Sequence, residues 1–364
     1  MQELSNTNQE YYFTDSEINN KIQQIKNSGV KLNIRFVNEE DYVWQLHNST
    51  GNAKYLKAFY EYANQKGYDA SPEFLGINGK KQIPKSELEL YALLGLQYVP
   101  PELRETADAI IAAQKFQIPT LIEPKDMLGM LHIHTDWSDG KDTIRTMALK
   151  SKDLGFQYVT ICDHSAYAAY ANGLSYPRIL QQASEIDQLN AEGLGIKILK
   201  GIESDILPNG DLDYTPEILG MFDIVVASIH SNFRMNKADM TRRIIKAASN
   251  PFTTIIGHPT GRLLLTRAGY EIDIDEFTNV CAEFGKVIEI NANPYRLDLP
   301  WEHAIKAKEL GIKFAINPDS HRADTLSDVF IGVKAARKAW LTKDDVINTL
   351  TLEEFESKYI IRNK

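Results

Sequence analysis

The sequence predicts an α/β protein: a seven-stranded (β/α) barrel preceded by a small α+β domain. From about residue 128, short apolar β-rich runs alternate with longer amphipathic segments, as in a parallel sheet with helical crossovers. Polar side chains suited to metal binding follow almost every run. A barrel brings all its strand ends to one mouth, whereas an open doubly wound sheet gathers them at one switch point, so the barrel is favoured.

The expected strands are short and almost continuously apolar, which is typical of strands covered on both faces. They span residues 128–135, 158–164, 196–205, 223–230, 253–259, 286–294 and 312–321. Helical periodicity is clear in four intervening segments, each ending in glycine. These segments span residues 142–155, 177–193, 275–285 and 301–311.

The region before the barrel has a different pattern. Residues 30–37 alternate like a strand, residues 52–67 predict a helix closed by Gly67, and residues 85–96 predict a second helix. We expect a small domain over 1–105, a linker over 106–127 marked by Pro119 and Pro124, and the barrel over 128–364.

Bulk composition narrows the functional classes. The chain has 40 Lys and Arg against 49 Asp and Glu, a net charge of −9, and neither part is basic. A broad nucleic-acid-binding surface is therefore disfavoured, although a small patch stays possible. The two cysteines form no CxxC pair, the N-terminus lacks a signal-peptide pattern, and no apolar run has membrane-spanning length. We expect a cytoplasmic protein without a membrane partner.

Nine potential metal ligands lie at or just beyond the downstream ends of the expected strands. They are His132, His134, Asp139, His164, Glu203, His230, His258, Asp319 and His321. Nine ligands are too many for one ion, and mixed imidazole and carboxylate ligation suits Mn, Zn or Fe. The sequence therefore predicts two or three divalent metal ions.

The first and last expected strands carry matching pairs. Residues i and i+2 of a strand share a face, so His132 and His134 point the same way, and Asp319 and His321 repeat the spacing. These strands are neighbours in a closed barrel. A histidine such as His258 would, alone, more often be a hydrogen-bonded core residue; the coincidence of both pairs favours ligands.

Several neighbouring residues have secondary or open interpretations. Asp139 could merely cap its turn, but the nearby histidines favour a role as a metal ligand. Glu203 is placed to bridge two cations. Asp205 is expected to be an acid of the following loop. We expect Asp163 to orient an imidazole from behind the ligands. Arg262 could hold a phosphate oxygen or form a surface salt bridge.

Two asparagines of the EINANP segment keep two interpretations: Asn291 and Asn293 could bind substrate or fix their loop. The chemistry of the whole set is clearer. Closely spaced cations lower the pKa of a bound water and neutralise the oxygens of a phosphate, so phosphoester hydrolysis is the expected reaction.

The motifs HxHTxxSDG, DHS, GIExDI, SIHS, GHPTGR, EINANP and DSH resemble, in order and spacing, the PHP (polymerase and histidinol phosphatase) domain from about Leu128 to the C-terminus. The resemblance implies a distorted seven-stranded barrel with a trinuclear site. A suitable residue fills every position that corresponds to a metal ligand of the family.

Within that family, GHPTGRLL, NANPYRLDL and LYALLGLQYVPPELRE are similar to bacterial family X DNA polymerases, whose PHP barrel acts as a Mn-dependent 3′–5′ exonuclease or 3′-end phosphoesterase. Residues 1–105 then resemble a truncated palm and thumb. The segment with the first two polymerase acids is missing, and Asn33 occupies the third position. An amide cannot supply an anionic Mg ligand, so polymerase activity is expected to be absent.

Three functions stay open. The first is hydrolysis at DNA 3′ ends, the second is a phosphatase of a small phosphorylated substrate like histidinol phosphatase, and the third is a non-catalytic scaffold. An open groove at the mouth would favour the first and a closed pocket the second. A scaffold would be expected to have lost ligands, and none is lost in the sequence.

Overall fold

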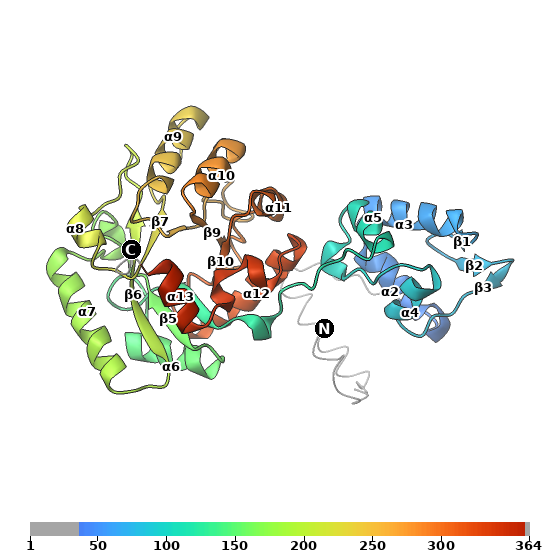
Figure 1. Ribbon diagram of the computed structural model, residues 1–364, viewed down its shortest axis with the longest axis horizontal. Helices are drawn as coiled ribbons and strands as arrows, with labels where there is room; N and C mark the ends of the chain where they lie inside the picture. Colours follow the sequence, from blue (N-terminus) through green and yellow to red (C-terminus); the bar gives the residue numbers. More distant parts are fainter. Residues whose placement is uncertain (1–35, 361–364) are drawn as a thin grey trace.

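The computed structural model describes residues 36–360. The chain forms a small N-terminal unit and a larger barrel, which lie side by side in Figure 1 and meet near helix α12. The predicted strand at 30–37 falls largely outside the described residues, as does Asn33; Phe36 and Val37 lie in no strand.

Seven parallel strands form the barrel, and those that follow one another in the chain pair with each other. Their bounds are β4 Gly129–Ile133, β5 Tyr158–Ile161, β6 Lys197–Asp205, β7 Ile224–Ser228, β8 Ile255–Ile256, β9 Val287–Asn291 and β10 Phe314–Asn317. Almost all of their residues are buried, as expected for strands covered on both faces. The seven predicted strands and the barrel class are confirmed.

The barrel closes at a seam between β4 and β10, where an isolated bridge joins Ile133 and Ser320. Asn348 fills the rest of the seam. Its side-chain amide donates to the carbonyl oxygens of Gly129 on β4 and Ile316 on β10, at 3.0 and 2.9 Å, and its Oδ1 accepts from the Ile316 N–H at 2.8 Å. One side chain thus replaces ladder bonds that the two strands do not make directly.

Helices cover the outside of the barrel (Figure 1). They are α6 Ile144–Asp153, α7 Tyr176–Ala191, α8 Pro216–Leu219, α9 Lys237–Ala248, α10 Ile274–Glu283, α11 Trp301–Glu309, α12 Val329–Lys338 and α13 Leu352–Tyr359. The four predicted helices are confirmed. Gly155 follows α6 at φ +96°, a conformation that glycine adopts without the usual steric cost.

From residue 36 onward, the N-terminal unit packs four helices and a small antiparallel sheet. The helices are α2 Tyr42–Thr50, α3 Ala53–Gln65, α4 Glu87–Leu93 and α5 Asp108–Gln114; the strands are β1 Asp69–Ala70, β2 Leu75–Ile77 and β3 Lys80–Lys81. The helices predicted over 52–67 and 85–96 are confirmed.

Short 3-10 helices complete the chain. They are η1 Glu39–Asp41, η2 Pro101–Leu103, η3 Pro124–Asp126, η4 Ala169–Ala171, η5 Ala323–Asp328, η6 Lys343–Asp345 and η7 Ile347–Thr349.

The core of the N-terminal unit includes residues from the predicted linker, because Ala109, Ile110 and Ala113 of α5 are buried in it. The division of the chain at residues 105 and 128 stays a prediction. Two ion pairs join the units: Arg337 Nε lies 2.7 Å from Glu102 Oε1, and Lys338 Nζ lies 2.7 Å from Glu105 Oε1.

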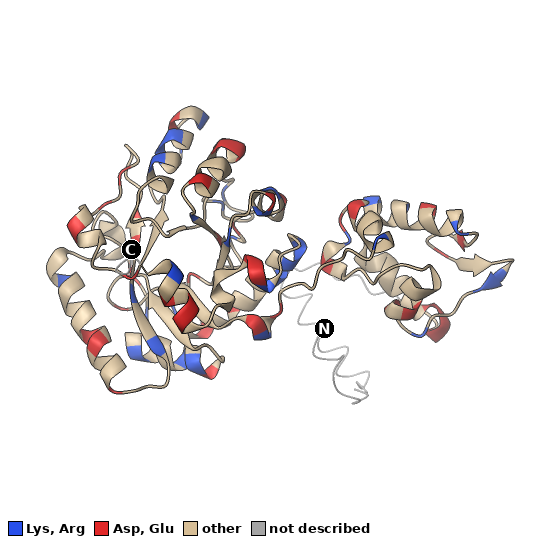
Figure 2. Cartoon of the chain, in the orientation of Figure 1, with Lys and Arg blue, Asp and Glu red and all other residues tan. Residues whose placement is uncertain are grey.

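Basic and acidic residues are both distributed along the helices of the two units (Figure 2). Both cysteines, Cys162 and Cys281, are buried free thiols. Within residues 36–360, none of the helices combines the length and apolar character needed to cross a membrane.

Candidate metal centre

The nine predicted ligands converge at the carboxyl ends of the barrel strands. Each has a side-chain nitrogen or oxygen within 3.6 Å of such an atom of another member, so they form one connected cluster. His132 and His134 leave β4 on one face, with their Nε2 atoms 3.2 Å apart. The β4–β10 seam brings Asp319 Oδ1 to 3.1 Å from His134 Nε2, as the matching i, i+2 pairs predicted.

Glu203 lies at the centre of the cluster and is 1% exposed. Its two carboxylate oxygens lie among five imidazoles. Oε1 lies 3.0 Å from His258 Nε2, 3.3 Å from His230 Nε2 and 3.5 Å from His132 Nε2; Oε2 lies 3.0 Å from His164 Nδ1 and 3.5 Å from His134 Nε2. This position fits a carboxylate that bridges two cations.

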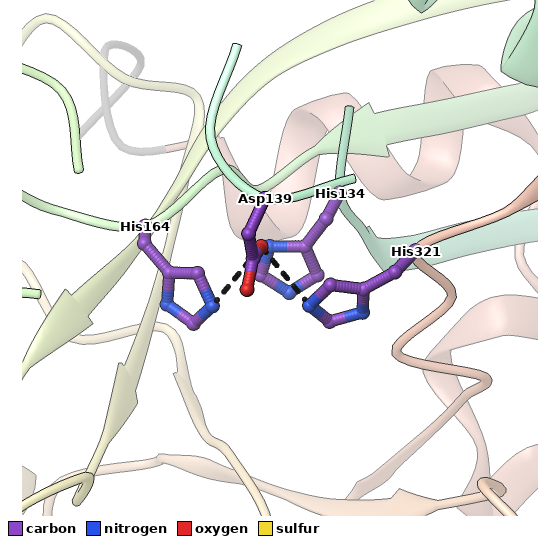
Figure 3. A group of neighbouring side chains, drawn as sticks. All are labelled: His134, Asp139, His164 and His321. Atoms are coloured by element: carbon purple, nitrogen blue, oxygen red, sulfur yellow. Dashed lines mark ion pairs between the residues drawn. The ribbon is translucent and has the colours of Figure 1, made fainter. Parts of the chain in front are cut away.

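Eight of the nine candidate ligands, all but His258, fall into three overlapping groups, and within each group the ligand atoms lie within 4.8 Å of one another. The groups are His134, Asp139, His164 and His321; His132, His134 and Asp319; and His164, Glu203 and His230. Figure 3 shows the first group, in which Asp139 forms ion pairs with His164 and His321. The side chains of Asp139 and His321 are 36% and 35% exposed, so this group faces solvent.

Glu289, within β9, supports two of the ligands from behind. Its Oε1 lies 2.8 Å from His132 Nδ1, and its Oε2 accepts the backbone N–H of His258 at 2.8 Å. The amides of Asn317 and Asn291 donate to the same carboxylate at 3.0 and 3.2 Å. The sequence analysis missed this acid; the available signal was a carboxylate inside the apolar strand VIEIN.

Asp205 is a correction to the expectation of a loop acid. It is the last residue of β6, is fully buried, and its Oδ1 lies 3.2 Å from His230 Nδ1. The alternating geometry of the strand places it behind His230 while Glu203, two residues earlier, faces the same interior.

Asp163 serves the turn after β4 rather than an imidazole. Its carboxylate accepts the N–H and hydroxyl of Thr135 at 2.8 and 2.6 Å and the amide of Gln182 at 2.7 Å. Ser138 also donates to it. Asp163 therefore fixes the turn that carries Asp139.

The guanidinium of Arg262 is bound to backbone rather than directed at the cluster. It donates to the carbonyl oxygens of Arg296, at 2.9 Å, and Leu297. Arg296 lies at the cluster instead, with Nε 3.7 Å from Asp319 Oδ2. The phosphate role of Arg262 stays a prediction, and Arg296 is the better placed guanidinium.

The two asparagines of the EINANP segment fix local structure. Asn291 Nδ2 donates to Asp319 Oδ2 at 3.0 Å, and Asn293 Oδ1 accepts the N–H of Tyr295 at 3.0 Å.

Two candidate ligands, Asp319 and His258, have positive φ angles of +52° and +25°, a region that residues other than glycine adopt uncommonly. Such strain persists where surrounding structure imposes it, typically at functional sites.

Burial and the dense charges shift the protonation of the cluster. Burial alone would lower the pKa of His132, but Glu289, Glu203 and Asp319 outweigh it and raise that pKa well above its usual value. Burial and the neighbouring His321 and His164 lower the pKa of His134 to about 3. Protons and cations would therefore compete for the same buried nitrogens.

The donor set fits divalent metal ions. Glu203 Oε2 and His164 Nδ1 are buried and make no hydrogen bond, an arrangement that is unfavourable without a cation. Imidazole nitrogens with carboxylate oxygens are the ligands of Zn, Mn and Fe sites.

Comparison with known proteins gives matches to both units. The family model of the PHP domain matches residues 130–293, and that of the DNA polymerase beta thumb matches residues 45–105. The chain is 42% identical over 335 residues to the DNA polymerase/3′-5′ exonuclease PolX of Bacillus subtilis; the match covers 91% of this chain and 58% of that protein. The chain thus spans little more than half the length of this relative.

Other relatives match the barrel. A protein named Probable phosphatase from Thermoanaerobacter sp. (strain X514) is 32% identical over 229 residues, which cover 60% of this chain and 89% of that protein. Among solved structures, histidinol phosphate phosphatase of Lactococcus lactis in complex with zinc, L-histidinol and phosphate matches with a TM-score of 0.44 and 20% identity, covering 58% of this chain and 94% of that one.

The parallel barrel, the candidate ligands at its mouth, the PHP domain match and the phosphatase relative define a metal-dependent phosphoesterase. The chain belongs to the PHP domain family, and a region similar to the DNA polymerase beta thumb precedes its barrel.

Proposed function

We propose that the barrel hydrolyses phosphodiester bonds at the 3′ ends of DNA with two or three Mn, Zn or Fe ions. The carrying observation is the position of Glu203 among five imidazoles, because a carboxylate whose two oxygens face different histidines is placed to bridge more than one ion. The name of the Bacillus subtilis relative and the thumb match support DNA as the substrate.

The nine clustered side chains would hold the ions. Ions bound there supply Lewis acidity toward a phosphate oxygen and lower the pKa of a water. Asp139 and His321 mark the solvent-facing side, so the phosphate would arrive there. The Arg296 guanidinium would bind one of its oxygens through charge-assisted hydrogen bonds.

Buried acids would set which nitrogen of each histidine is free. His132 would donate a hydrogen bond from Nδ1 to the Glu289 carboxylate. His230 would donate one from Nδ1 to the Asp205 carboxylate. The Nε2 atoms of both residues, which face Glu203, then keep their lone pairs for a cation.

The N-terminal unit would dock or stabilise the substrate-bound barrel. The absence of polymerase activity stays a prediction, because it rests on Asn33, which lies outside the described residues.

The test is hydrolysis by the purified chain with Mn. We expect stepwise release of nucleotides from the 3′ end of a 5′-labelled single-stranded oligonucleotide, and release of phosphate from a 3′-phosphorylated one. A Glu203→Gln variant is the matched inactive control.

The named phosphatase relative favours a second candidate, a phosphatase of small phosphomonoesters. Hydrolysis of glycerol 2-phosphate without any oligonucleotide cleavage would establish that candidate and contradict the proposal.

A further inference from the structure

Tyr170 stands at the edge of the metal centre with most of its ring in solvent. It lies on η4, after β5, and is 72% exposed. Its ring centroid is 6.3 Å from that of the ligand His164, with an angle of 54° between the rings. The rest of the centre is far less accessible, so this is a large apolar surface beside the reactive groups.

The loop that carries Tyr170 is held in place on both sides. Asn172 Nδ2 donates to the carbonyl oxygens of Trp137 and Ser138 at 3.3 Å, which ties the loop to the turn bearing Asp139. On the other side, the N–H of Tyr167 donates to Asp213 Oδ2 at 2.7 Å. The ring is therefore presented by a fixed loop, which lowers the entropy cost of binding a flat partner.

The hydroxyl of Tyr170 is influenced by the charges of the cluster. Desolvation, followed by the charges of Asp205, Glu203 and Asp139, raises the pKa of this hydroxyl. Arg296, on the loop after β9, acts on the same hydroxyl in the opposite sense. The ring contact with His164 places Tyr170 at the edge of the same cluster that Arg296 approaches at Asp319.

We propose that Tyr170 is the stacking platform for the nucleobase next to the phosphate that is hydrolysed. This role rests on the proposed function. Contact with the base would let the site distinguish a nucleotide from phosphoesters that lack a base. Stacking on an aromatic side chain accepts any base, since every base has a π face. It also suits a chain of net charge −9, which has limited capacity to hold a strand by phosphate contacts alone.

The test compares two 5′-labelled oligonucleotides that differ only in the 3′-terminal residue, a normal nucleotide or an abasic tetrahydrofuran. Base–aromatic stacking contributes about 1–3 kcal/mol, so Tyr170→Ala should lower kcat/KM on the normal end by about tenfold or more. The loss on the abasic end should be less than twofold. Tyr170→Phe, which keeps the π face, should behave as the unchanged protein.

Two further variants separate stacking from other roles. Tyr170→Leu keeps an apolar cover over His164 but not the π face, and should lose activity as Tyr170→Ala does. Phe284 is a matched control: it is 47% exposed and follows the C-terminal end of α10, on the barrel face opposite the mouth. Phe284→Ala should leave both rates unchanged, and all variants should keep the same metal content.

The outcomes separate this inference from the proposed function. If the unchanged protein cleaves neither oligonucleotide, the DNA-end proposal fails, and the same variants are compared on adenosine 5′-monophosphate and glycerol 2-phosphate. A tenfold loss confined to the base-bearing substrate of either pair supports the stacking platform. Equal losses on both substrates, or no selective loss in either pair, overturn it.

Discussion

Glu289 Oε1 lies 2.8 Å from Nδ1 of His132, and both side chains are fully buried. The other oxygen of this carboxylate accepts the backbone N–H of His258 at 2.8 Å. One acid on β9 thus orients the ring of His132, on β4, and fixes the backbone at His258, after β8. The carboxylate links two candidate ligands from different strands of the barrel.

A Glu289→Gln variant should bind Mn about 10–100-fold more weakly, the usual range for loss of a carboxylate behind a ligating histidine. The amide keeps the shape of the side chain but cannot polarise the His132 ring as an anion does. Calorimetric titration of metal-free protein with Mn measures the change. Glu283→Gln, at an exposed position on α10, is the control. Equal affinities for the two variants would show that Glu289 has only a packing role.

Replacing the central carboxylate should lower the metal content. In Glu203→Gln, five imidazoles lose the anion that lies among them, so we expect the metal content to fall by at least one ion per chain. Hydrolysis should fall by at least about 10²-fold, as for loss of a principal electrostatic group. Elemental analysis and initial rates measure both effects. Asp187→Asn on α7 is a control, and full metal content in Glu203→Gln would refute a bridging role.

The convergence of the candidate ligands could be predicted because strand ends in a parallel barrel meet at one mouth; metal binding by these residues stays a prediction. The matching pairs His132/His134 and Asp319/His321 needed only the two-residue period of a strand and the neighbourhood of β4 and β10. The seven strands followed from apolar runs alone.

Supporting residues were harder, because their roles depend on tertiary contacts that local sequence does not encode. Glu289 lies inside a strand rather than at its end, and Asp205 is separated from Glu203 by one residue yet serves His230 from behind. Sequence spacing made Arg262 a candidate for phosphate binding. In the structure, its guanidinium donates hydrogen bonds to two carbonyl oxygens of the 296–297 segment instead. The head group of Arg296 is the one at the cluster.

The two arginines should therefore separate in experiments. Arg296→Ala should lower kcat/KM by about 10–100-fold, since a hydrogen bond to a charged group contributes about 1.5–3 kcal/mol. Its melting temperature should change little. Arg262→Ala should lower the melting temperature, because two carbonyl oxygens lose their donor. Steady-state rates and thermal melts of both variants check this; the opposite pattern would return the phosphate role to Arg262.

The barrel seam should depend on Asn348. Asn348→Ala leaves the Ile316 N–H and the carbonyl oxygens of Gly129 and Ile316 without these partners in a buried position. We expect the free energy of unfolding to fall by about 2–3 kcal/mol, the cost of unsatisfied buried groups. Urea unfolding measures it. Thr349→Ala, next in the chain and only partly buried, should change stability less; equal small effects would mean that the seam closes without the amide.

The N-terminal unit should lose stability in mild acid because of His47, which is fully buried on α2. Burial, with the charge of Arg104, lowers the pKa of His47 well below 6.5. Below pH about 6.5 the unfolded chain therefore binds a proton that the folded chain does not, and the free energy of unfolding falls by up to about 1.4 kcal/mol per pH unit. His47→Phe removes this group from both states, so its stability should fall less between pH 7.5 and pH 5.5 than that of the unchanged chain. Urea unfolding at both pH values measures the change in the free energy of unfolding for each protein. The barrel histidines contribute equally to this change in the two proteins, so the comparison isolates His47. The same pH dependence in both proteins would mean that His47 is protonated in the folded state as readily as in the unfolded chain.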